Sequence, residues 1–523
     1  MHLYTIYSQQ IFEVVMLAKV KSFALTGLKG YPVDVELDIN PGVPSYDTVG
    51  LASTAVKESK ERVRSAVKNS GYDFPLKRIT VNLAPADTKK EGPIFDLAIA
   101  VALMVATGSI EEGSRDYVIL GTLSLDGTVC KINGVMPILI SAVQAGYKRF
   151  IVPADNALEA SFIEGAEVYA VGSLIECVEF LKGEKLLKRV VSGSYLDGGC
   201  VKDYGVDFSE VKGQSVAKRA LEIAVAGGHN ALMIGPPGAG KTMLAKCVPT
   251  IMPPMSFEEA LEVTKIHSVA GVLGDTGIVT KRPFRTPHHT ATVVSLTGGG
   301  TNSHPGEISL AHNGVLFLDE LPEYPRHTLE TLRQPLEDGV ITVSRASGTV
   351  EYPAHFMLIA SMNPCPCGNF GSRIHQCTCS DHERKRYASK LSGPLLDRID
   401  LHIEVDGISY KSLKDDTVLE SSEVIKERVK RAREIQLERF RGLGIYTNAQ
   451  MTNAMIAEFC KIDKASDKLL ESAFEKLRLS ARANSRILKV ARTIADLDGA
   501  ERIEERHVYE AIKYRSLDRK YYV

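Results

Sequence analysis

The stretch ALMIGPPGAGKT at residues 231–242 decides the fold of this chain. Its four apolar residues, 231–234, predict a buried strand, and the glycine-rich turn after them leads into a helix that we expect to end at Pro249. Glycines let the backbone N–H groups of such a turn point at the phosphates of a nucleotide. We therefore predict a P-loop that binds ATP through Gly235, Pro236, Pro237, Gly238, Ala239, Gly240, Lys241, Thr242 and Met243.

Side chains of this turn and of a later strand predict the chemistry. The Lys241 ammonium reaches the β and γ phosphates, and the Thr242 hydroxyl is an oxygen ligand for Mg²⁺. A second apolar strand, GVLFL at residues 314–318, ends in Asp319 and Glu320. We predict that Asp319 holds Mg²⁺ and that Glu320 polarises the attacking water.

Two further polar residues complete the predicted catalytic site. Asn363 follows a predicted strand at residues 356–360 and is expected to orient the water from the other side, although a turn-forming Asn is the alternative. Arg398 lies in the loop SGPLLDRID, residues 392–400. An arginine that reaches the γ-phosphate of a neighbouring subunit raises the rate about 10³–10⁵-fold. From the residues alone, however, a surface pair of Asp397 and Arg398 is favoured.

The pattern along the chain predicts an α/β protein with several domains. Residues 1–15 are expected to be an N-terminal extension, and residues 16–183 mix strand and helix patterns as an α+β domain does. Residues 184–205 lose the pattern and are predicted to be a linker. Residues 206–405 alternate strands and helices as a parallel sheet requires, and residues 406–523 are predicted to form a helical lid domain.

Composition limits the class of protein. The 523 residues carry 63 Lys and Arg against 64 Asp and Glu, which excludes a polycationic nucleic-acid coat. Residues 421–523 carry 22 cations against 16 acids, so the neutral charge is an average over the chain and does not by itself exclude a nucleic-acid partner. The apolar run at residues 97–107 is too short for a membrane span and predicts a buried helix. The nine cysteines, five of them scattered and four close together, are not spread like a disulfide framework, which favours the cytoplasm.

Four of these cysteines form the pattern C-x-C-x9-C-x-C. They are Cys365, Cys367, Cys377 and Cys379. Four thiolates suit tetrahedral Zn²⁺ and leave no open position, so we predict a structural zinc site. The gaps of one residue are tighter than is usual, and His375 or His382 is an alternative ligand; free buried thiols are the other interpretation.

Two segments bear on the substrate. Residues 340–352 predict a β-hairpin whose Arg345, near the tip, is a candidate DNA phosphate contact; subunit packing is the alternative role. The stretch KRPFRTPHH at residues 281–289 gathers cations and imidazoles, so Arg285 is a second candidate for DNA contact. His288 and His289 are an alternative metal pair, but no third ligand follows at a suitable spacing.

Together these blocks resemble AAA+ ATPases of the helix-2-insert and pre-sensor-insert group, and more closely the bacterial magnesium-chelatase-like family. The resemblance spans residues 16–515. It rests on the P-loop, RPFRTPHH at 282–289, GEISLAH at 306–312, LFLDELPE at 316–323, SMNPCPCG at 361–368 and residues 392–400.

The resemblance implies a role for each motif. It makes Lys241 and Thr242 the Walker A pair, Asp319 and Glu320 Walker B, Asn363 sensor 1, Arg398 the arginine finger, and Arg482 sensor 2 with Arg486 as the alternative. It also implies that residues 208–214 pack on adenine and that the subunits assemble as a ring, typically a homo-hexamer. The N-terminal unit resembles the α+β domain of the Lon-protease type, which has an S5-like fold.

The same resemblance implies an Mg²⁺-dependent motor on forked, branched or single-stranded DNA, with helicase or branch-migration activity in homologous recombination during natural transformation. A magnesium-chelatase-type or other protein-remodelling ATPase without a DNA substrate is the alternative. Proteolysis is disfavoured because Ile94 and Met136 stand where the Lon-type serine and lysine would be. Apolar side chains can neither attack a carbonyl nor accept a proton.

Overall fold

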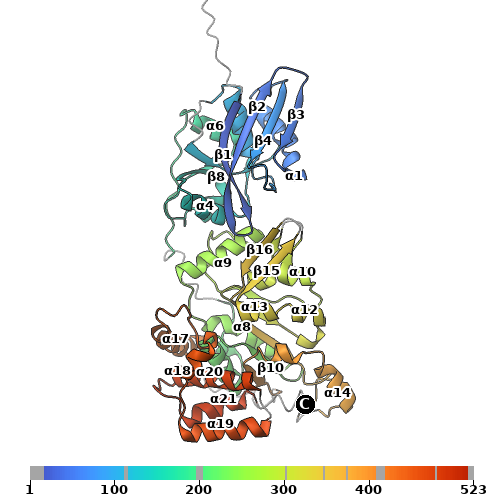
Figure 1. Ribbon diagram of the computed structural model, residues 1–523, viewed down its shortest axis with the longest axis vertical. Helices are drawn as coiled ribbons and strands as arrows, with labels where there is room; N and C mark the ends of the chain where they lie inside the picture. Colours follow the sequence, from blue (N-terminus) through green and yellow to red (C-terminus); the bar gives the residue numbers. More distant parts are fainter. Residues whose placement is uncertain are drawn as a thin grey trace, which may run out of the picture. The chain divides into compact units, whose positions relative to one another are not determined.

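The computed structural model describes residues 17–110, 116–195, 204–300, 303–345, 348–372, 375–407, 419–477 and 480–515. The predicted extension at 1–15 and residues 196–203 of the predicted linker lie outside these ranges. The chain divides into two compact units (Figure 1). Unit 1 contains Met1–Gly199, Ala260–Val279 and Ser344–Val350, and unit 2 contains Cys200–Glu259, Thr280–Val343 and Glu351–Val523.

Unit 1 is built on a seven-stranded mixed sheet with the strand order β3-β4-β2-β1-β5-β8-β9. The strands are β1 (Leu17–Thr26), β2 (Lys29–Asn40), β3 (Ser45–Val49), β4 (Arg78–Ala84), β5 (Tyr117–Ile119), β8 (Arg149–Pro153) and β9 (Glu167–Val171), with a small pair β6 (Thr122–Leu123) and β7 (Val129–Cys130) beside them. Strand β2 buries every second residue, Val33 to Ile39, as its alternating sequence predicts.

Helices cover this sheet and supply much of its core. They are α1 (Thr54–Lys57), α2 (Ser59–Asn69), α3 (Asp96–Ala106), α4 (Val135–Gln144), α5 (Ala157–Ala160) and α6 (Leu174–Leu181). Every residue of α3 is buried, which confirms the predicted buried helix. Asp96, at its start, is balanced by Arg62, whose Nε lies 2.6 Å away. Such pairing is what a buried carboxylate requires.

Unit 2 contains a five-stranded sheet in which all strands run parallel, as the alternating pattern predicts. The strands are β10 (Ala231–Ile234), β11 (Phe284–Arg285), β14 (Val315–Leu318), β17 (Met357–Met362) and β18 (Leu401–Glu404). Their order is β11-β14-β17-β10-β18. Strand β17 therefore lies between the P-loop strand and the strand that ends in Asp319. Because the strands are parallel, their carboxyl ends meet at one edge, where ligands of open α/β sheets bind.

The short helices of unit 2 lie around this sheet. They are α7 (Ser215–Gly227), α8 (Lys241–Ile251), α10 (Val293–Thr297), α11 (Glu307–Leu310), α12 (Arg326–Glu330), α13 (Arg333–Asp338), α14 (Asp381–Ala388) and α15 (Gly393–Leu396). Two small strand pairs accompany them: β12 (Gly298–Gly299) with β13 (His304–Pro305), and the predicted hairpin of β15 (Val340–Arg345) and β16 (Gly348–Pro353). Helix α9 (Phe257–Ala270) belongs to both units.

The expected end of the P-loop helix at Pro249 is wrong. Helix α8 continues to Ile251 with Pro249 inside its last turn. A proline in a helix leaves one backbone carbonyl, here that of Ala245, without its usual donor. The last turn nevertheless carries a further hydrogen bond, because the Thr250 hydroxyl donates to the carbonyl of Cys247 at 2.6 Å. The apolar side of the turn also stays buried, because Val248 and Ile251 both pack in the core.

The carboxyl-terminal region is helical, as predicted. Helices α17 (Ser422–Arg439), α18 (Asn453–Phe459), α19 (Lys464–Leu477), α20 (Ala481–Leu497) and α21 (Glu505–Lys513) gather at the red end of the chain (Figure 1). Amphipathic faces hold them together: α17 buries Ile425 and Val429, and α20 buries Ile487, Val490 and Ile494. No helix among the described residues is long and apolar enough to cross a bilayer.

Candidate nucleotide and metal sites

The P-loop holds a buried lysine at the start of α8. The Lys241 side chain bends back over the turn, and its amine donates to the carbonyl oxygens of Gly235 at 2.7 Å and Pro236 at 2.9 Å. The same amine lies 3.2 Å from Oδ1 of Asn363. Burial lowers the pKa of Lys241, and the nearby carboxylates of Asp319 and Glu320 oppose this effect. The lysine is thus held where anionic phosphates would meet it.

The predicted magnesium ligands lie next to each other. Thr242 donates its hydroxyl to Oδ2 of Asp319 at 2.9 Å, although the two residues are 77 positions apart. Ser361, in β17, donates to the other carboxylate oxygen of Asp319. A hydroxyl and a carboxylate so placed are a suitable oxygen pair for Mg²⁺.

Glu320 takes a backbone conformation that few residues adopt. Its φ is 53°, in the left-handed region, and its side chain is 54% exposed. Such conformations cost of order 1–3 kcal/mol and cluster at functional sites. The Glu320 carboxylate lies near His289, whose Nδ1 is 3.8 Å from it, whereas the Asp319 carboxylate contacts Thr242 and Ser361. The carboxylates of Asp319 and Glu320 therefore have different contact partners, although the two residues are adjacent in the chain.

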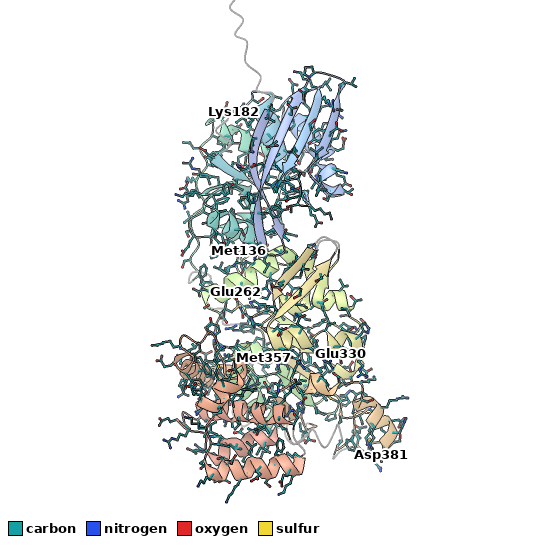
Figure 2. All side chains as sticks on the ribbon, in the orientation of Figure 1. Met136, Lys182, Glu262, Glu330, Met357 and Asp381 are labelled. Carbon is teal, nitrogen blue, oxygen red and sulfur yellow. The ribbon has the colours of Figure 1, made fainter. Side chains whose placement is uncertain are left out.

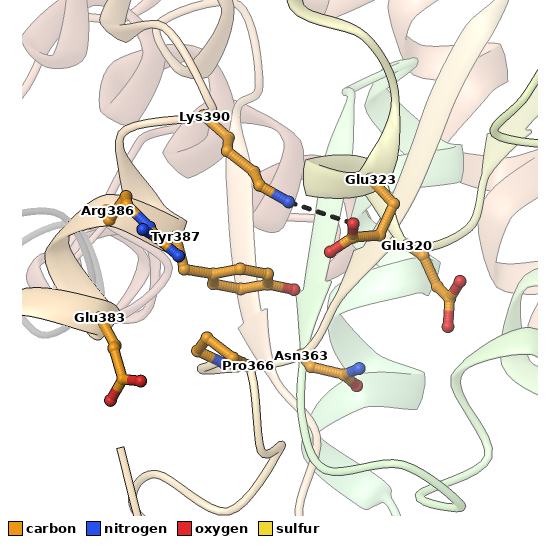
Figure 3. Close-up of a pocket in the computed structure, with 8 residues that line it drawn as sticks. All are labelled: Glu320, Glu323, Asn363, Pro366, Glu383, Arg386, Tyr387 and Lys390. Carbon is orange, nitrogen blue, oxygen red and sulfur yellow. Dashed lines mark hydrogen bonds and ion pairs between the residues drawn. The ribbon is translucent and has the colours of Figure 1, made fainter. Parts of the chain in front are cut away.

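A pocket of about 420 Å³ opens beside Glu320 and Asn363 (Figure 3). Acidic, basic and uncharged side chains line it: Glu320, Glu323, Asn363, Pro366, Glu383, Arg386, Tyr387 and Lys390. The Lys390 amine donates to Glu323 at 3.1 Å. The Tyr387 ring extends between these groups, and the backbone of Asn363 hydrogen-bonds to its hydroxyl.

Arg398 is held inside its own subunit. Its guanidinium pairs with Glu337 and donates to the carbonyl of Pro394 at 2.8 Å. The Arg398 side chain is 15% exposed, whereas Glu337 is 61% exposed, so the pair lies at the surface. Asn230, directly before β10, donates to the carbonyl of Arg398 at 3.0 Å and ties this loop to the sheet.

The two candidates for sensor 2 lie in different surroundings. Arg482 is exposed in the first turn of α20. Arg486, one turn later, pairs with the buried Asp400. Burial alone would raise the pKa of Asp400, but Arg486 and His229 outweigh burial and hold it well below its usual range. Arg486 therefore has a structural partner, whereas Arg482 faces solvent.

The four predicted zinc ligands come together. Their sulfur atoms lie within 4.8 Å of one another, the one such group of three or more candidate ligands in the described part of the chain. The Sγ of Cys365 is 3.4 Å from that of Cys367 and 3.7 Å from that of Cys377. A tetrahedron with zinc–sulfur bonds of about 2.3 Å has edges of about 3.8 Å, so the spacing fits the ion. A backbone hydrogen bond from Asn369 lowers the pKa of Cys367 to about 5, whereas burial raises the pKa of Cys365 to about 12, so the case for a metal rests on the spacing of the sulfurs.

The candidate DNA contacts are placed differently. Arg285 makes two hydrogen bonds to Glu307, at 2.6 and 2.7 Å, and is half-buried. Arg345 ends strand β15, and its side chain lies outside the described ones. The rings of His288 and His289 lie 4.0 Å apart, and no third ligand joins them among the described residues.

The residues at the Lon-type protease positions are apolar side chains in packed surroundings. Met136, in α4, is fully buried, and its backbone N–H donates to Oε1 of Glu159 at 2.9 Å (Figure 2). Ile94 is half-buried and packs against the unit 1 core. Neither side chain offers a nucleophile or a base.

Several residues near the predicted site were not assigned a role there from the sequence, although Ser361 and His289 lie inside quoted motifs. Ser361 contacts Asp319, His289 lies beside Glu320, and Tyr387 contacts Asn363. Ser361 could have been found, because it precedes Asn363 by two residues in a strand and so shares its face. The other two come from distant segments, and only the folded chain brings them to the site.

Comparison with protein families places matches along most of the chain. Residues 207–413 match magnesium chelatase, subunit ChlI; residues 35–156 match subunit ChlI of Mg-chelatase; and residues 419–515 match the ChlI C-terminal domain.

Curated proteins match over almost the whole length. The YifB protein of Escherichia coli (strain K12) is 43% identical over 506 residues, which cover 96% of this chain and 98% of that protein. The competence protein ComM of Haemophilus influenzae is 42% identical over 513 residues, with the same two coverages. A Lon protease of Rhizobium meliloti is 28% identical over 151 residues, which cover 28% of this chain and 19% of that protein.

Proposed function

Because the chain belongs to the family of the magnesium chelatase ChlI subunits, with an AAA+ core and a Lon-like N-terminal part, we propose that it is an Mg²⁺-dependent ATPase that moves DNA. The observation that carries the ATPase is the convergence of four side chains at one sheet edge. Thr242 contacts Asp319, and Lys241 contacts Asn363. These side chains follow three neighbouring strands: β10 for Lys241 and Thr242, β14 for Asp319 and β17 for Asn363. Lys241 and Thr242 bind the phosphates and the metal, and Asp319 completes the metal site.

The residues divide the hydrolytic work. Bound Mg²⁺ would neutralise charge on the phosphates. The Glu320 side chain is 54% exposed beside His289, so its carboxylate is accessible to an attacking water and can take a proton from it. Asn363 orients that water from the adjacent strand end. Lys241 holds the phosphates while its amine stays near the Asn363 amide.

The assembly we propose is a homo-hexameric ring. Arg398 lies at the surface in a pair with the exposed Glu337, and exchange of this partner for the γ-phosphate of a neighbouring subunit would complete that neighbour's site. Arg482, exposed at the start of α20, is the proposed sensor 2. The place of action is proposed to be the cytoplasm.

The substrate we propose is forked, branched or single-stranded DNA. Support comes from the likeness to a protein named for competence, since uptake of DNA leads to recombination intermediates that a branch-migration motor extends. Arg345 is the first candidate for the phosphate contact. Arg285 is the weaker one, since its guanidinium is already bound to Glu307.

Zinc is the proposed ion of the four-cysteine cluster. Four sulfurs at tetrahedral spacing leave no coordination position for a substrate, so the ion is structural. The cluster is thus separate from the proposed Mg²⁺ site at Thr242 and Asp319.

A second candidate function is a remodelling ATPase that acts on a protein or on a magnesium–porphyrin system. The family description, magnesium chelatase, favours it. Residues outside the ATPase core do not distinguish the two functions, so the substrate must be tested directly.

The experiment is ATP turnover measured with a panel of forks, four-way junctions, single strands and duplexes, together with strand displacement. A DNA motor is expected to be stimulated by branched or single-stranded DNA and to displace a strand. Salt-dependent DNA binding should accompany this activity. ATP turnover without any response to DNA would favour the remodelling ATPase, and no turnover under any condition would refute both.

A further inference from the structure

The four-cysteine cluster adjoins three parts of the proposed catalytic site. Cys365 and Cys367 follow Asn363 by two and four residues, immediately after β17. Gly368, next in the chain, abuts the P-loop, because a methyl group on its Cα would lie 2.6 Å from Cδ of Pro237. Its φ of 77° also favours glycine. One half of the cluster is therefore continuous with Asn363 and touches the phosphate-binding turn.

The other half of the cluster leads directly into α14. Cys379 precedes Ser380, which caps this helix in a reciprocal arrangement with Glu383. Arg384, in the first turns of the helix, donates to the carbonyl of Cys379 at 2.9 Å. Its guanidinium lies 4.5 Å from the centre of the Phe370 ring, in the loop between the two cysteine pairs. These contacts join the start of α14 to the cysteine loop.

Helix α14 in turn contacts the catalytic residues. Tyr387 is 7% exposed, and the backbone of Asn363 hydrogen-bonds to its hydroxyl. Just past the helix, Lys390 pairs with Glu323 at 3.1 Å, three residues after Glu320. Figure 3 shows Tyr387 reaching from α14 into the group formed by Asn363 and Glu323. Asn363 is thus held twice, through the chain to Cys365 and through Tyr387 to α14.

This arrangement has little apolar packing of its own. Of the four cysteines only Cys365 is buried, and Phe370 is half-buried. Fixing one residue costs roughly 1–2 kcal/mol of conformational entropy, so a loop of this kind needs a cross-link to stay ordered. A metal bound by four thiolates supplies such a link, and its binding free energy becomes folding free energy.

We infer that the metal held by Cys365, Cys367, Cys377 and Cys379 positions Asn363 and α14 for ATP turnover, while ATP binding, which the P-loop carries, does not depend on this metal. Tyr387 is then a positioning residue that acts through Asn363. This inference rests on the proposed ATPase. A displacement of about 1 Å in a catalytic group can cost a factor of about 10² in rate, which is the scale of effect expected.

The first test compares the double variant Cys367→Ser with Cys379→Ser against wild type, with Cys130→Ser as a matched control. Cys130 is also partly exposed but lies in unit 1. Zinc per chain, affinity for a fluorescent ATP analogue, and kcat without DNA are measured. We expect about one zinc in wild type and in the control, and loss of zinc in the double variant. Its nucleotide affinity should stay within about threefold, while kcat falls about 100-fold.

The second test separates positioning from folding. Tyr387→Phe keeps the ring and removes the hydroxyl, so zinc content and nucleotide affinity should match wild type while kcat falls about fivefold. When wild-type protein is treated with a chelator, freed of the chelator and assayed with excess Mg²⁺, kcat should be lowered, and added Zn²⁺ should restore it. Tyr387→Phe leaves all four cysteines unchanged. It therefore still tests the positioning role if the cysteine variants fail to fold.

The outcomes separate this inference from the ATPase itself. Wild-type protein with zinc but without ATP turnover would refute the ATPase. Turnover that persists after zinc is lost, a wild-type protein without metal, or a Tyr387→Phe protein with wild-type kcat would overturn the positioning role alone. Loss of nucleotide binding together with zinc would overturn it too, because the metal would then maintain the whole pocket.

Discussion

The amine of Lys241 lies 3.2 Å from Oδ1 of Asn363, a residue 122 positions later in the chain. This contact joins the P-loop to the end of β17, the strand between β10 and β14. Both residues come from the same edge of the sheet, so a phosphate bound by the lysine would lie beside the amide. The contact brings together the proposed phosphate-binding residue, Lys241, and the residue proposed to orient the attacking water, Asn363.

Replacement of Lys241 should therefore abolish nucleotide binding. In Lys241→Ala the pocket loses the cation that the P-loop offers to the phosphates and the partner of the Asn363 amide. We expect the affinity for an ATP analogue to fall by a factor of about 100 or more, in line with loss of a charge-assisted contact that is partly buried. Titration with a fluorescent analogue measures this. An affinity within threefold of wild type would contradict the phosphate-binding role.

Replacement of Glu320 should separate binding from turnover. Glu320→Gln keeps the shape of the side chain but cannot accept a proton, so kcat should fall about 10²–10⁴-fold while ATP binding persists. Single-turnover kinetics with a parallel binding assay measure both. Glu438→Gln is the control, since Glu438 is exposed on α17, pairs with Arg441 and does not line the pocket. Normal hydrolysis by Glu320→Gln would rule out the catalytic assignment.

Arg398 should act on a neighbouring subunit. Arg398→Ala is expected to bind ATP but to lose hydrolysis by a factor of about 10³ or more. Lys241→Ala subunits cannot bind ATP, yet they carry an intact Arg398. Mixing the two variants should restore part of the activity, because an intact P-loop can then lie next to an intact arginine. A mixture as inactive as either variant alone would contradict action between subunits.

Arg345 should contribute to DNA binding without affecting basal hydrolysis. Arg345→Ala removes one phosphate contact per subunit, so DNA affinity should fall and the salt dependence of binding should become shallower. Fluorescence anisotropy with a forked DNA at several salt concentrations measures this. Arg441→Ala is a suitable control, because Arg441 is 78% exposed on the helical region. Unchanged DNA binding and strand displacement would remove the hairpin from the DNA path.

Asp400 should stabilise the contact between the α/β sheet and the helical lid. It accepts from His229, and it pairs with Arg486 on α20. Removal of one partner of a buried pair typically costs about 3–5 kcal/mol, so Asp400→Asn should lower the melting temperature of unit 2. Asp397→Asn, in the same loop, should change it little. Calorimetry of the full chain measures both, and equal melting temperatures would contradict the stabilising role.

The pH dependence of this effect follows from the sign of the pKa shift. The pKa of Asp400 is lowered in the folded chain. Its stabilising contribution is therefore fully present above the ordinary carboxyl value, about pH 4, and is lost as pH falls through the lower value in the fold. The difference between wild type and Asp400→Asn should be the same at pH 7 and pH 5.5 and should shrink below about pH 4.

Local patterns predicted a large part of the proposed site. The P-loop strand and its helix start, the acidic end of β14, the β15–β16 hairpin and the buried helix α3 each depend on neighbouring residues, and the described structure contains all of them. The one clear local error was the helix end at Pro249. A rule that ends helices at proline ignores the buried apolar face of the last turn, where Val248 and Ile251 pack in the core.

The sequence by itself determined which chemical groups are present and which strand or turn carries each one, because these features arise over a few residues. Only the tertiary structure decided that β17 inserts between β10 and β14, that Arg486 rather than Arg482 pairs with Asp400, and that Tyr387 contacts Asn363. Such pairings depend on which distant surfaces pack together. Packing minimises the exposed apolar area and the unpaired charge of the whole unit. A short stretch of sequence cannot determine these pairings, because they depend on residues far away in the chain.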